Sequence, residues 1–329
     1  MGCCYKLRLC PTLSHGLGII SIMYKSEIQK PQHGSLEWLQ TRHRNAQGKC
    51  IVGASEVSTL MGVNEYDTIS DLAVRKLLAP EVGEMNDAMN RGNLLEPAIV
   101  AYATQQLGVE LICPDVMYLH NRIISTLDAR GEGEHAGIVV EAKSNNHWSH
   151  TTPLPDAWYW QAQAQMHCTG VDEIIFSILD RNMRFGLDRV ERNDEMIELM
   201  QNHVELFCEA IDAEKLPEDV RLTAPQVADL FPKAEGETAL DNNAVAMIET
   251  WIELKEALKE LEAKEQAIKN ALADMMRGAE FGTVDGCRVL SYKTQSAKRF
   301  DSKALLAAQP ELQEIYTTQS TFRVLRTMK

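Results

Sequence analysis

The chain has 329 residues, which is long enough for one substantial core and a smaller appended unit. Its 45% hydrophobic and 24% charged residues are typical of a folded globular protein and exclude a largely disordered chain. The formal net charge of -14 excludes a protein that coats nucleic acid nonspecifically, because coating depends on excess Lys and Arg; an enzyme that encloses its substrate is not excluded.

The cysteine pattern and the first residues indicate the compartment. The 8 cysteines are scattered, with no C-x-x-C pair, which is typical of reduced intracellular usage. The apolar stretch at residues 16–23 is too short for a signal peptide or a membrane span. We therefore expect a cytoplasmic protein without a membrane partner, in which residues 1–33 form a disordered leader.

The predicted elements begin at Ser35, which can cap a helix that contains Trp38. Three more helices are expected before residue 110, at residues 54–60, 70–78 and 93–107. Gly108 supplies the end of the last of these helices, and Pro97 fits best in its first turn.

Short β-branched runs with turn residues between them come next. They predict strands at residues 116–119, 123–127, 138–142 and 173–179. A helix over residues 156–168 separates the last two strands, and a long acidic helix follows at residues 194–213. The pattern predicts an α+β fold in which helices flank a central sheet.

A second region, residues 219–329, is expected after the acidic helix. Residues 247–275 carry apolar side chains at alternate spacings of three and four, a heptad seam that is interrupted at Glu265. The dipeptide Asp285-Gly286 then predicts the turn of a β-hairpin, and a short helix follows. The domain that carries the chemistry is therefore expected at residues 34–218, with a helical and β-hairpin extension after it.

Glu141 and Lys143 are expected to share one face of a strand. Side chains alternate along a strand, so the Glu141 carboxylate and the Lys143 ammonium point the same way. Val140 and Ala142 then face the opposite, packed side. This strand is predicted to present a polar face that carries one negative and one positive charge.

A second carboxylate, Asp128, is expected to lie beside Glu141. The preceding strand is predicted to end at Asp128, and the turn-rich residues 130–134 let the chain fold back. Carboxylate oxygens suit hard divalent cations, which activate water and neutralise charge on a scissile phosphate. Lys143 would orient that water or stabilise the phosphate. Without further context, however, an Asp followed by Glu-x-Lys is more typical of a solvated sheet edge.

Six motifs in one order supply that context. They are Trp38-Leu39-Gln40-Thr41-Arg42, Gly53-Ala54-Ser55-Glu56-Val57, Arg91-Gly92-Asn93-Leu94-Leu95-Glu96, Leu127-Asp128, Glu141-Ala142-Lys143 and Gln161-Ala162-Gln163. In this order they resemble the lambda-exonuclease, or YqaJ-type, viral recombinase family, which implies a PD-(D/E)xK nuclease core with a restriction-endonuclease-like mixed sheet. Ala129 departs from the Gly that many relatives have after the metal-binding Asp.

The resemblance implies a metal site. Asp128 and Glu141 would hold the ions, two Mg²⁺ with Mn²⁺ as the alternative, and the backbone carbonyl of Ala142 would complete one shell. Lys143 would be the catalytic lysine. Glu96 is similar to an additional metal-site carboxylate of the family, although taken alone it is more typical of a first-turn Glu favoured by the helix dipole.

Glutamines on one helix are also implied in the site. Gln161 resembles the active-site glutamine of the family, and Gln165 lies one turn further on the same helix face. Gln163 is a candidate DNA contact. For Gln163 and Gln165, an ordinary place on a polar helix face is nearly as plausible as a functional one.

Arg42 and Ser55 correspond to family positions that bind a terminal 5′ phosphate. A guanidinium grips phosphate bidentately, and a hydroxyl near a helix N-terminus adds a donor. The alternative for Ser55 is that it only caps its helix. Arg44 and Lys49 are candidates for further DNA contacts, although a solvated loop is the default for both.

The resemblance implies a 5′→3′ exonuclease that acts on double-stranded DNA ends and leaves 3′ single-stranded tails. It also implies a ring-shaped homotrimer and a single-strand annealing protein as partner. One alternative is another nuclease of the same fold, either RecB-like or an endonuclease of DNA repair. The non-enzymatic alternative is a coiled-coil interaction protein, in which the helix at residues 247–275 carries the function.

Overall fold

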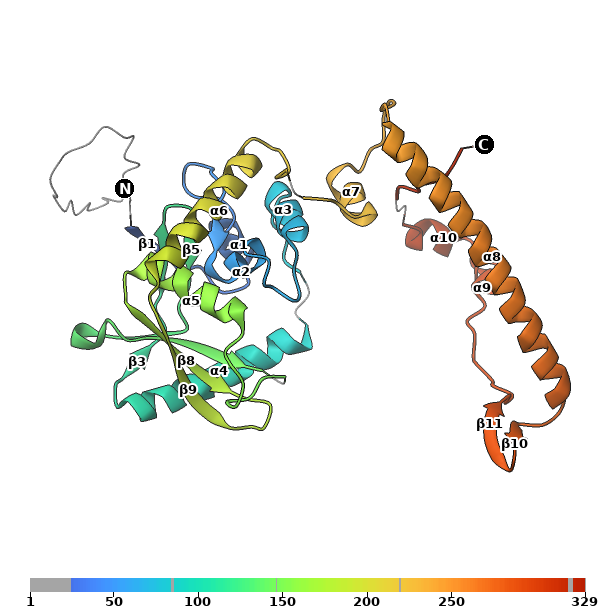
Figure 1. Cartoon of the computed structure of the whole chain (residues 1–329), viewed down its shortest axis with the longest axis horizontal. Coiled ribbons are helices and arrows are strands. Elements are labelled where there is room, and N and C mark those ends of the chain that lie inside the picture. Colours follow the sequence, from blue (N-terminus) through green and yellow to red (C-terminus); the bar gives the residue numbers. More distant parts are fainter. Residues whose placement is uncertain (1–24, 84–85, 146, 219, 319–321, 329) are drawn as a thin grey trace. The chain divides into compact units, whose positions relative to one another are not determined.

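The computed structural model describes residues 25–83, 86–145, 147–218, 220–318 and 322–328. The chain divides into two compact units, Met1–Gln226 and Val227–Lys329 (Figure 1). The expected α+β class with a central mixed sheet is confirmed in the first unit. None of the helices in the described ranges is both long and apolar enough to cross a membrane.

A four-stranded sheet has the strand order β1-β4-β5-β2. β1 (Lys25–Gln29) and β4 (Val116–His120) are antiparallel, as are β4 and β5 (Ile123–Ser125), whereas β2 (Val52–Gly53) runs parallel to β5. β1 falls within the stretch expected to be a disordered leader, which corrects that expectation over these five residues. The leader up to residue 24 lies outside the described residues.

A five-stranded mixed sheet, of order β3-β6-β7-β8-β9, carries the candidate chemistry. Only β7 and β8 are parallel; every other pair is antiparallel. The strands are β3 (Leu111–Ile112), β6 (Ala129–Gly131), β7 (Val139–Ser144), β8 (Glu173–Leu179) and β9 (Phe185–Glu191). β9 is an edge strand that the hydrophobic pattern did not predict, because Val190 is the one residue of this strand that is buried.

The position of Asp128 differs from the sequence prediction. β5 ends at Ser125, and β6 starts at Ala129, so Asp128 lies just before a strand and not at the end of one. Arg130 and Gly131 were expected in a turn but pair with β7 and β3. The reversal of the chain comes later, at the short 3-10 helix Gly133–His135. Asp128 still lies opposite β7, as expected.

Short helices precede the first long one. They are α1 (Leu36–Thr41), the 3-10 turn η1 (Ala54–Glu56), α2 (Val57–Leu60) and α3 (Ile69–Leu77), close to the predicted ranges. The expected cap of α1 is confirmed, since the Ser35 hydroxyl accepts the N–H of Trp38 at 3.2 Å. This cap fixes where α1 begins, six residues before Arg42.

α4 (Asp87–Leu107) begins earlier than predicted, at a cap supplied by Asn86. Pro97 therefore lies inside the helix, and its predicted place in the first turn is wrong. Proline in a helix interior lacks the N–H for one helical bond. The buried Ile99 and Ala103 hold the helix against the sheet and offset that loss. Gly108 ends the helix with a left-handed φ of 65°, as predicted.

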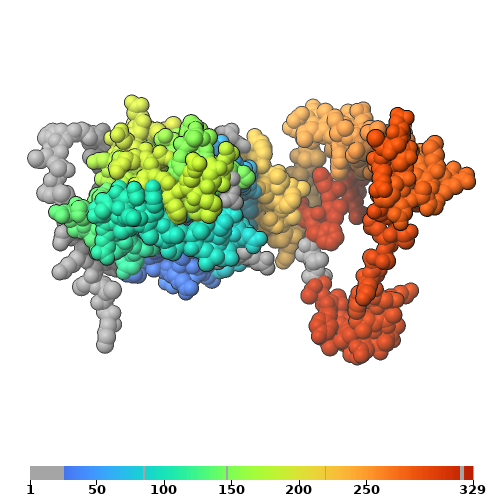
Figure 2. Space-filling view, turned by 90° about the horizontal axis from the view of Figure 1, so that it is seen from below, coloured from blue at the N-terminus to red at the C-terminus, as the bar shows by residue number. Residues whose placement is uncertain are grey.

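Helices cover both faces of the five-stranded sheet (Figure 1). α4 packs on one face through Ala103, which clusters with Val140 and Ile175, and it lies at the surface of this unit (Figure 2). α5 (Asp156–Thr169) covers the other face, and α6 (Asp194–Asp212) packs on α5. Residues of β7 therefore alternate between a face toward α4 and a face toward α5.

The second unit contains α8 (Asn242–Met276), the hairpin of β10 (Phe281–Val284) and β11 (Cys287–Ser291), α9 (Ser302–Ala308) and α10 (Glu311–Tyr316). A short helix, α7 (Ala224–Leu230), spans the division between the units. Asp285 and Gly286 both have positive φ, which confirms the predicted hairpin turn. α8 confirms the predicted long helix, and it buries none of its residues.

Candidate active site

Strand β7 points Glu141 and Lys143 toward α5. Val140 packs with Ala103 on the α4 side, so the alternation of strand side chains turns Glu141 to the opposite face. Glu141 is buried, with 5% of its surface exposed. A buried carboxylate is costly unless its oxygens receive hydrogen bonds or a positive charge. The buried Glu141 carboxylate therefore needs donors or positive charge close to its oxygens.

Three side chains donate to the Glu141 carboxylate. Lys143 Nζ lies 2.7 Å from Oε1, and Gln161 Nε2 lies 2.5 Å from the same oxygen. Gln165 Nε2 donates to Oε2 at 2.5 Å. Lys143 Nζ also donates to Gln161 Oε1 at 2.9 Å, which closes a triangle of lysine, glutamate and glutamine. The lysine and its carboxylate are thus held in fixed orientations.

Asp128 lies beside β7, in the residue directly before β6. Its Oδ2 accepts the backbone N–H of Ala142 at 2.8 Å. Burial raises the pKa of Asp128 well above its ordinary value, and the negative charges of Glu141 and Glu96 raise it further. Lys143 and the Ala142 N–H act in the opposite direction but are outweighed. The positive charge around Asp128 is therefore too small to offset its burial and the neighbouring carboxylates.

Glu96 supplies a third carboxylate from α4. Burial raises the pKa of Glu96, as does Glu141, while Lys30 and Lys143 lower it. It opens into a cleft of about 560 Å³ whose lining includes Trp38, Met89, Glu96, Asp128, Glu141 and Ala142. The three predicted acidic residues are therefore brought to one cleft, together with the backbone of Ala142.

The donor set fits a hard divalent cation. Within the described ranges, no three carboxylate, imidazole or thiol side chains lie close enough to enclose a cation alone. Two carboxylates and the carbonyl of Ala142 would leave the remaining positions to water or phosphate oxygen, which is common for Mg²⁺. A cation there would relieve the repulsion that raises the pKa values of Asp128 and Glu96.

Arg42 and Ser55 form a second polar group in this unit. Arg42 Nη2 donates to Ser55 Oγ at 3.1 Å, and its guanidinium stacks on Trp38, 4.4 Å from the ring centroid. Burial lowers the pKa of Arg42, against the raising effects of Glu56 and Glu141. A Cβ on Gly53 would collide with Arg42 Nη2, so glycine leaves room for the guanidinium.

Glu56 and Lys76 support Arg42, and neither residue was predicted to have a role. Lys76 is buried, and its Nζ lies 2.8 Å from Glu56 Oε2 and 3.1 Å from the backbone carbonyl of Arg42. Burial of Glu56 acts to raise its pKa, but Lys76 and Arg42 outweigh it and hold the value at about 2. Glu56 is adjacent to Ser55 in the sequence, but nothing in the sequence indicates the pairing with α3.

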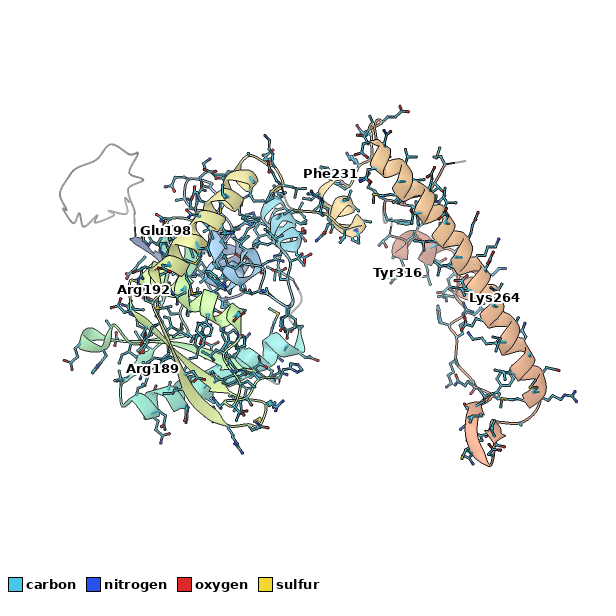
Figure 3. The ribbon with its side chains drawn as sticks, viewed as in Figure 1. Arg189, Arg192, Glu198, Phe231, Lys264 and Tyr316 are labelled. Carbon is cyan, nitrogen blue, oxygen red and sulfur yellow. The ribbon has the colours of Figure 1, made fainter. Side chains whose placement is uncertain are left out.

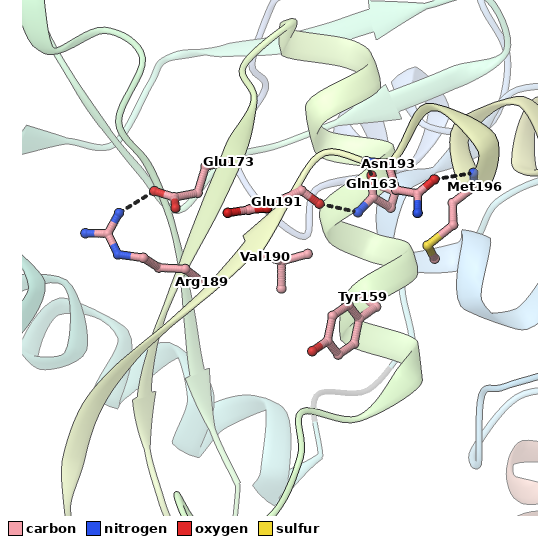
Figure 4. A pocket seen from close by; sticks show the side chains of 8 residues that line it. All are labelled: Tyr159, Gln163, Glu173, Arg189, Val190, Glu191, Asn193 and Met196. Carbon is pink, nitrogen blue, oxygen red and sulfur yellow. Dashed lines mark hydrogen bonds and ion pairs between the residues drawn. The ribbon is translucent and has the colours of Figure 1, made fainter.

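Three predicted DNA contacts do not join these groups. Arg44 Nη2 donates to the carbonyl of Lys76 at 2.7 Å, and Lys49 lies 3.8 Å from the carboxylate of Asp212. Gln163 is buried, donates to the Glu191 carbonyl and accepts the N–H of Asn193, each at 2.8 Å. Figure 4 shows Gln163 in a separate pocket between α5 and β9. Arg44 and Gln163 make bonds within the protein and lie outside both groups, and their DNA contacts stay predictions.

The five-stranded mixed sheet and the cleft form the arrangement expected of a restriction-endonuclease-like nuclease fold: Asp128, the Glu-x-Lys strand and a helix glutamine surround one carboxylate site. Residues 37–172 match the family model of the YqaJ-like viral recombinase domain. The predicted resemblance to this family is therefore confirmed over these residues.

The chain is 22% identical over 305 residues to an uncharacterized protein, YqaJ, of Bacillus subtilis (strain 168), covering 87% of this chain and 92% of the relative. An alkaline exonuclease (LHK-Exo) from Laribacter hongkongensis is similar at 24% identity and a TM-score of 0.45, over 55% of this chain and 94% of that one. A phage-related exonuclease from Haemophilus somnus 129PT is similar at 14% identity and a TM-score of 0.42, over 51% and 96%.

Proposed function

We propose that this chain is a metal-dependent exodeoxyribonuclease that hydrolyses one strand of duplex DNA from its 5′ end and leaves 3′ single-stranded tails. The observation that carries the proposal is the Glu141 carboxylate, fixed by Lys143, Gln161 and Gln165 beside Asp128. Acidic oxygens that bind a metal ion and a positioned amine can together catalyse phosphodiester hydrolysis.

The acidic residues would hold the cofactor. Asp128, Glu141 and the Ala142 carbonyl would bind Mg²⁺, Glu96 would serve a second ion, and Mn²⁺ is the alternative. When bound, the metal supplies charge neutralisation at the phosphate and lowers the pKa of water. Lys143, oriented by its bond to Gln161, would donate a hydrogen bond to the attacking water or to the phosphate oxygen.

The direction of cleavage would come from Arg42 and Ser55. A guanidinium fixed by stacking on Trp38 and a neighbouring hydroxyl can together bind a terminal 5′ phosphate. A chain of net charge -14 could hold duplex DNA by enclosing it, so a ring-shaped homotrimer is part of the proposal. A single-strand annealing protein that receives the 3′ tail would be its partner in recombination.

The proposal is tested with three DNA substrates: linear duplex with a 5′ phosphate, linear duplex with a 5′ hydroxyl, and closed circular duplex. Each is incubated with Mg²⁺ and, separately, with chelator. We expect rapid degradation of the phosphorylated linear duplex only with Mg²⁺. Cutting of the closed circle would identify an endonuclease instead, and equal rates on the two linear substrates would remove the phosphate role of Arg42.

A further inference from the structure

The hairpin between β8 and β9 ends in a rigid five-residue tip, residues 180–184. The buried Asp180 organises it: its Oδ1 accepts the backbone N–H groups of Asn182 and Arg184 at 2.8 and 2.9 Å. The backbone of Asp180 also bonds to Arg184 O and to Met183 N, each at 3.0 Å. These bonds hold the tip in one conformation, so its side chains project from fixed positions.

Two arginines of this tip point their charge into solvent. Arg181 and Arg184 are exposed, and within the described ranges neither guanidinium has an ion pair or a hydrogen bond. Arg189 of the same hairpin differs, because it pairs with Glu173 (Figure 4). Unpaired guanidinium groups on a rigid turn keep their full capacity to bind phosphate.

The sheet places this tip at the same edge as the candidate active site. β7 and β8 are parallel, with Lys143 opposite Ile178 and Ser144 opposite Leu179. Parallel strands present their carboxyl ends at one edge. Leu179 pairs with Ser144, and Arg181 comes two residues after Leu179. Two residues of extended chain span about 7 Å. The catalytic lysine and the tip are neighbours across this edge.

Contacts from the loop after β7 fix the tip to the sheet. The Trp148 carbonyl accepts the N–H of Arg181 at 3.0 Å, and His150 Nε2 lies 3.3 Å from the Arg184 carbonyl. The His150 ring occupies the space where a Cβ on Gly186 would lie, so glycine is needed there. Both arms of the hairpin are therefore bonded to the loop that leaves the catalytic strand.

The same aromatic residues continue to the catalytic lysine. Trp148 lies edge-on to His150, with 4.8 Å between ring centroids, and 5.8 Å from Trp158. Lys143 Nζ lies 5.9 Å from the centroid of Trp158. The packed rings of Trp158, Trp148 and His150 thus connect Lys143 to the tip at residues 180–184. Close packing of these rings fixes the distance between the lysine and the tip.

We infer that Arg181 and Arg184 form a phosphate-binding tip that contacts the backbone of duplex DNA next to the cleavage centre. The inference rests on the proposed nuclease function, and it names a DNA contact outside the cleft and outside the Arg42 group. Two phosphates bound by fixed guanidiniums would hold the duplex against the edge of the sheet from which Lys143 acts.

The test compares the variant R181A/R184A with R189A in the full-length chain. Arg189, labelled in Figure 3, matches the pair in residue type and hairpin, but its charge is neutralised by Glu173. Binding to a 5′-phosphorylated duplex is followed by fluorescence anisotropy in Ca²⁺, over a series of salt concentrations. Thermal unfolding of each variant checks that the fold is retained.

We expect the double variant to bind about tenfold more weakly, with the slope of log K against log salt reduced by about 2, since two phosphate contacts are lost. R189A should match the wild type. R181K/R184K should keep most of the slope. An unchanged affinity and slope in R181A/R184A would overturn the inference while leaving the proposed function intact. A wild-type chain that neither binds nor degrades DNA would overturn both.

Discussion

Two Glu–Lys pairs in the first unit have nearly the same separation but different surroundings. Glu56 and Lys76 lie 2.8 Å apart, and Glu141 and Lys143 lie 2.7 Å apart. Glu56 is surrounded by Lys76, Arg42 and a backbone N–H, so its charge is more than compensated and its pKa is about 2. Glu141 faces further carboxylates across a cleft.

The difference predicts that the Glu56–Lys76 pair stabilises the fold and that the Glu141–Lys143 pair takes part in catalysis. The Glu56 pair has no surplus charge and holds the backbone of Arg42 in place. Near the Glu141 pair, Asp128 and Glu96 have raised pKa values, because they are buried and lie close to further carboxylates. This cleft therefore has an excess of acidic groups next to a positioned amine. Perturbed carboxylates that share a cleft are typical of functional sites. Four substitutions test this distinction, from the largest expected effect to the smallest.

Substitution K143A should abolish cleavage while leaving the fold intact. We expect the single-turnover rate on 5′-phosphorylated duplex with Mg²⁺ to fall by at least about 10³-fold, because the amine stabilises charge that develops at the phosphate. Lys143 is half-buried, so its loss should change the unfolding midpoint only slightly. A variant that cleaves at the wild-type rate would show that the pair on β7 is structural.

Substitution K76M should have the opposite outcome, a loss of stability. The Lys76 side chain is 4% exposed, and its removal leaves Glu56 buried without its main partner. We expect the free energy of unfolding in urea to fall by about 3 kcal/mol. The double variant E56Q/K76M should recover part of this loss. Unchanged stability of K76M would contradict the supporting role of the pair.

Substitution R42A should reduce discrimination between DNA ends. We expect the preference for a 5′ phosphate over a 5′ hydroxyl, measured as the ratio of kcat/KM values, to fall by about 10- to 100-fold. R42K should recover only part of the preference, because an ammonium cannot bind phosphate bidentately. The rate on the hydroxyl substrate serves as the internal control, and a fall in both rates alike would place Arg42 elsewhere in the mechanism.

Substitution D128N should stabilise the metal-free protein at neutral pH. The pKa of Asp128 is raised in the folded state, so the fold binds this proton more tightly than the unfolded chain does. Stability of the metal-free wild type must then decrease as pH rises above about 4, the ordinary pKa of Asp, toward the raised value.

We expect D128N to remove that decrease and to raise stability at pH 7 by about 1 kcal/mol. Mg²⁺ should raise the melting temperature of the wild type but not of D128N, because binding to the folded state alone is stabilising. The measurement is thermal unfolding between pH 4 and 8, with Mg²⁺ and with chelator. An equal Mg²⁺ response in both proteins would remove Asp128 from the metal site.

Local sequence patterns were sufficient for the elements on which the chemistry depends. Alternation along β7 correctly placed Glu141 and Lys143 on one face, because Val140 had to reach the core. The helical spacing of Gln161 and Gln165 predicted that the two share one helix face, and both amides donate to Glu141. These features follow from one strand and one helix, each with a buried face.

Features that depend on distant partners were not predictable. β1 and β9 are edge strands whose extended form comes from pairing with β4 and β8. The pairing of Glu56 with Lys76 joins residues from different helices that no local pattern relates. The reversal that brings Asp128 to β7 was placed too early, because Arg130 and Gly131 read as turn residues until their strand partners are known.

Gly53 offers a route to changing the selectivity of the enzyme with one carbon atom. A methyl group at this position would collide with the Arg42 guanidinium, which would have to leave its place on Trp38 and beside Ser55. The substitution G53A is therefore expected to weaken the preference for a 5′ phosphate that is proposed for Arg42, and to leave the Glu141 site as it was.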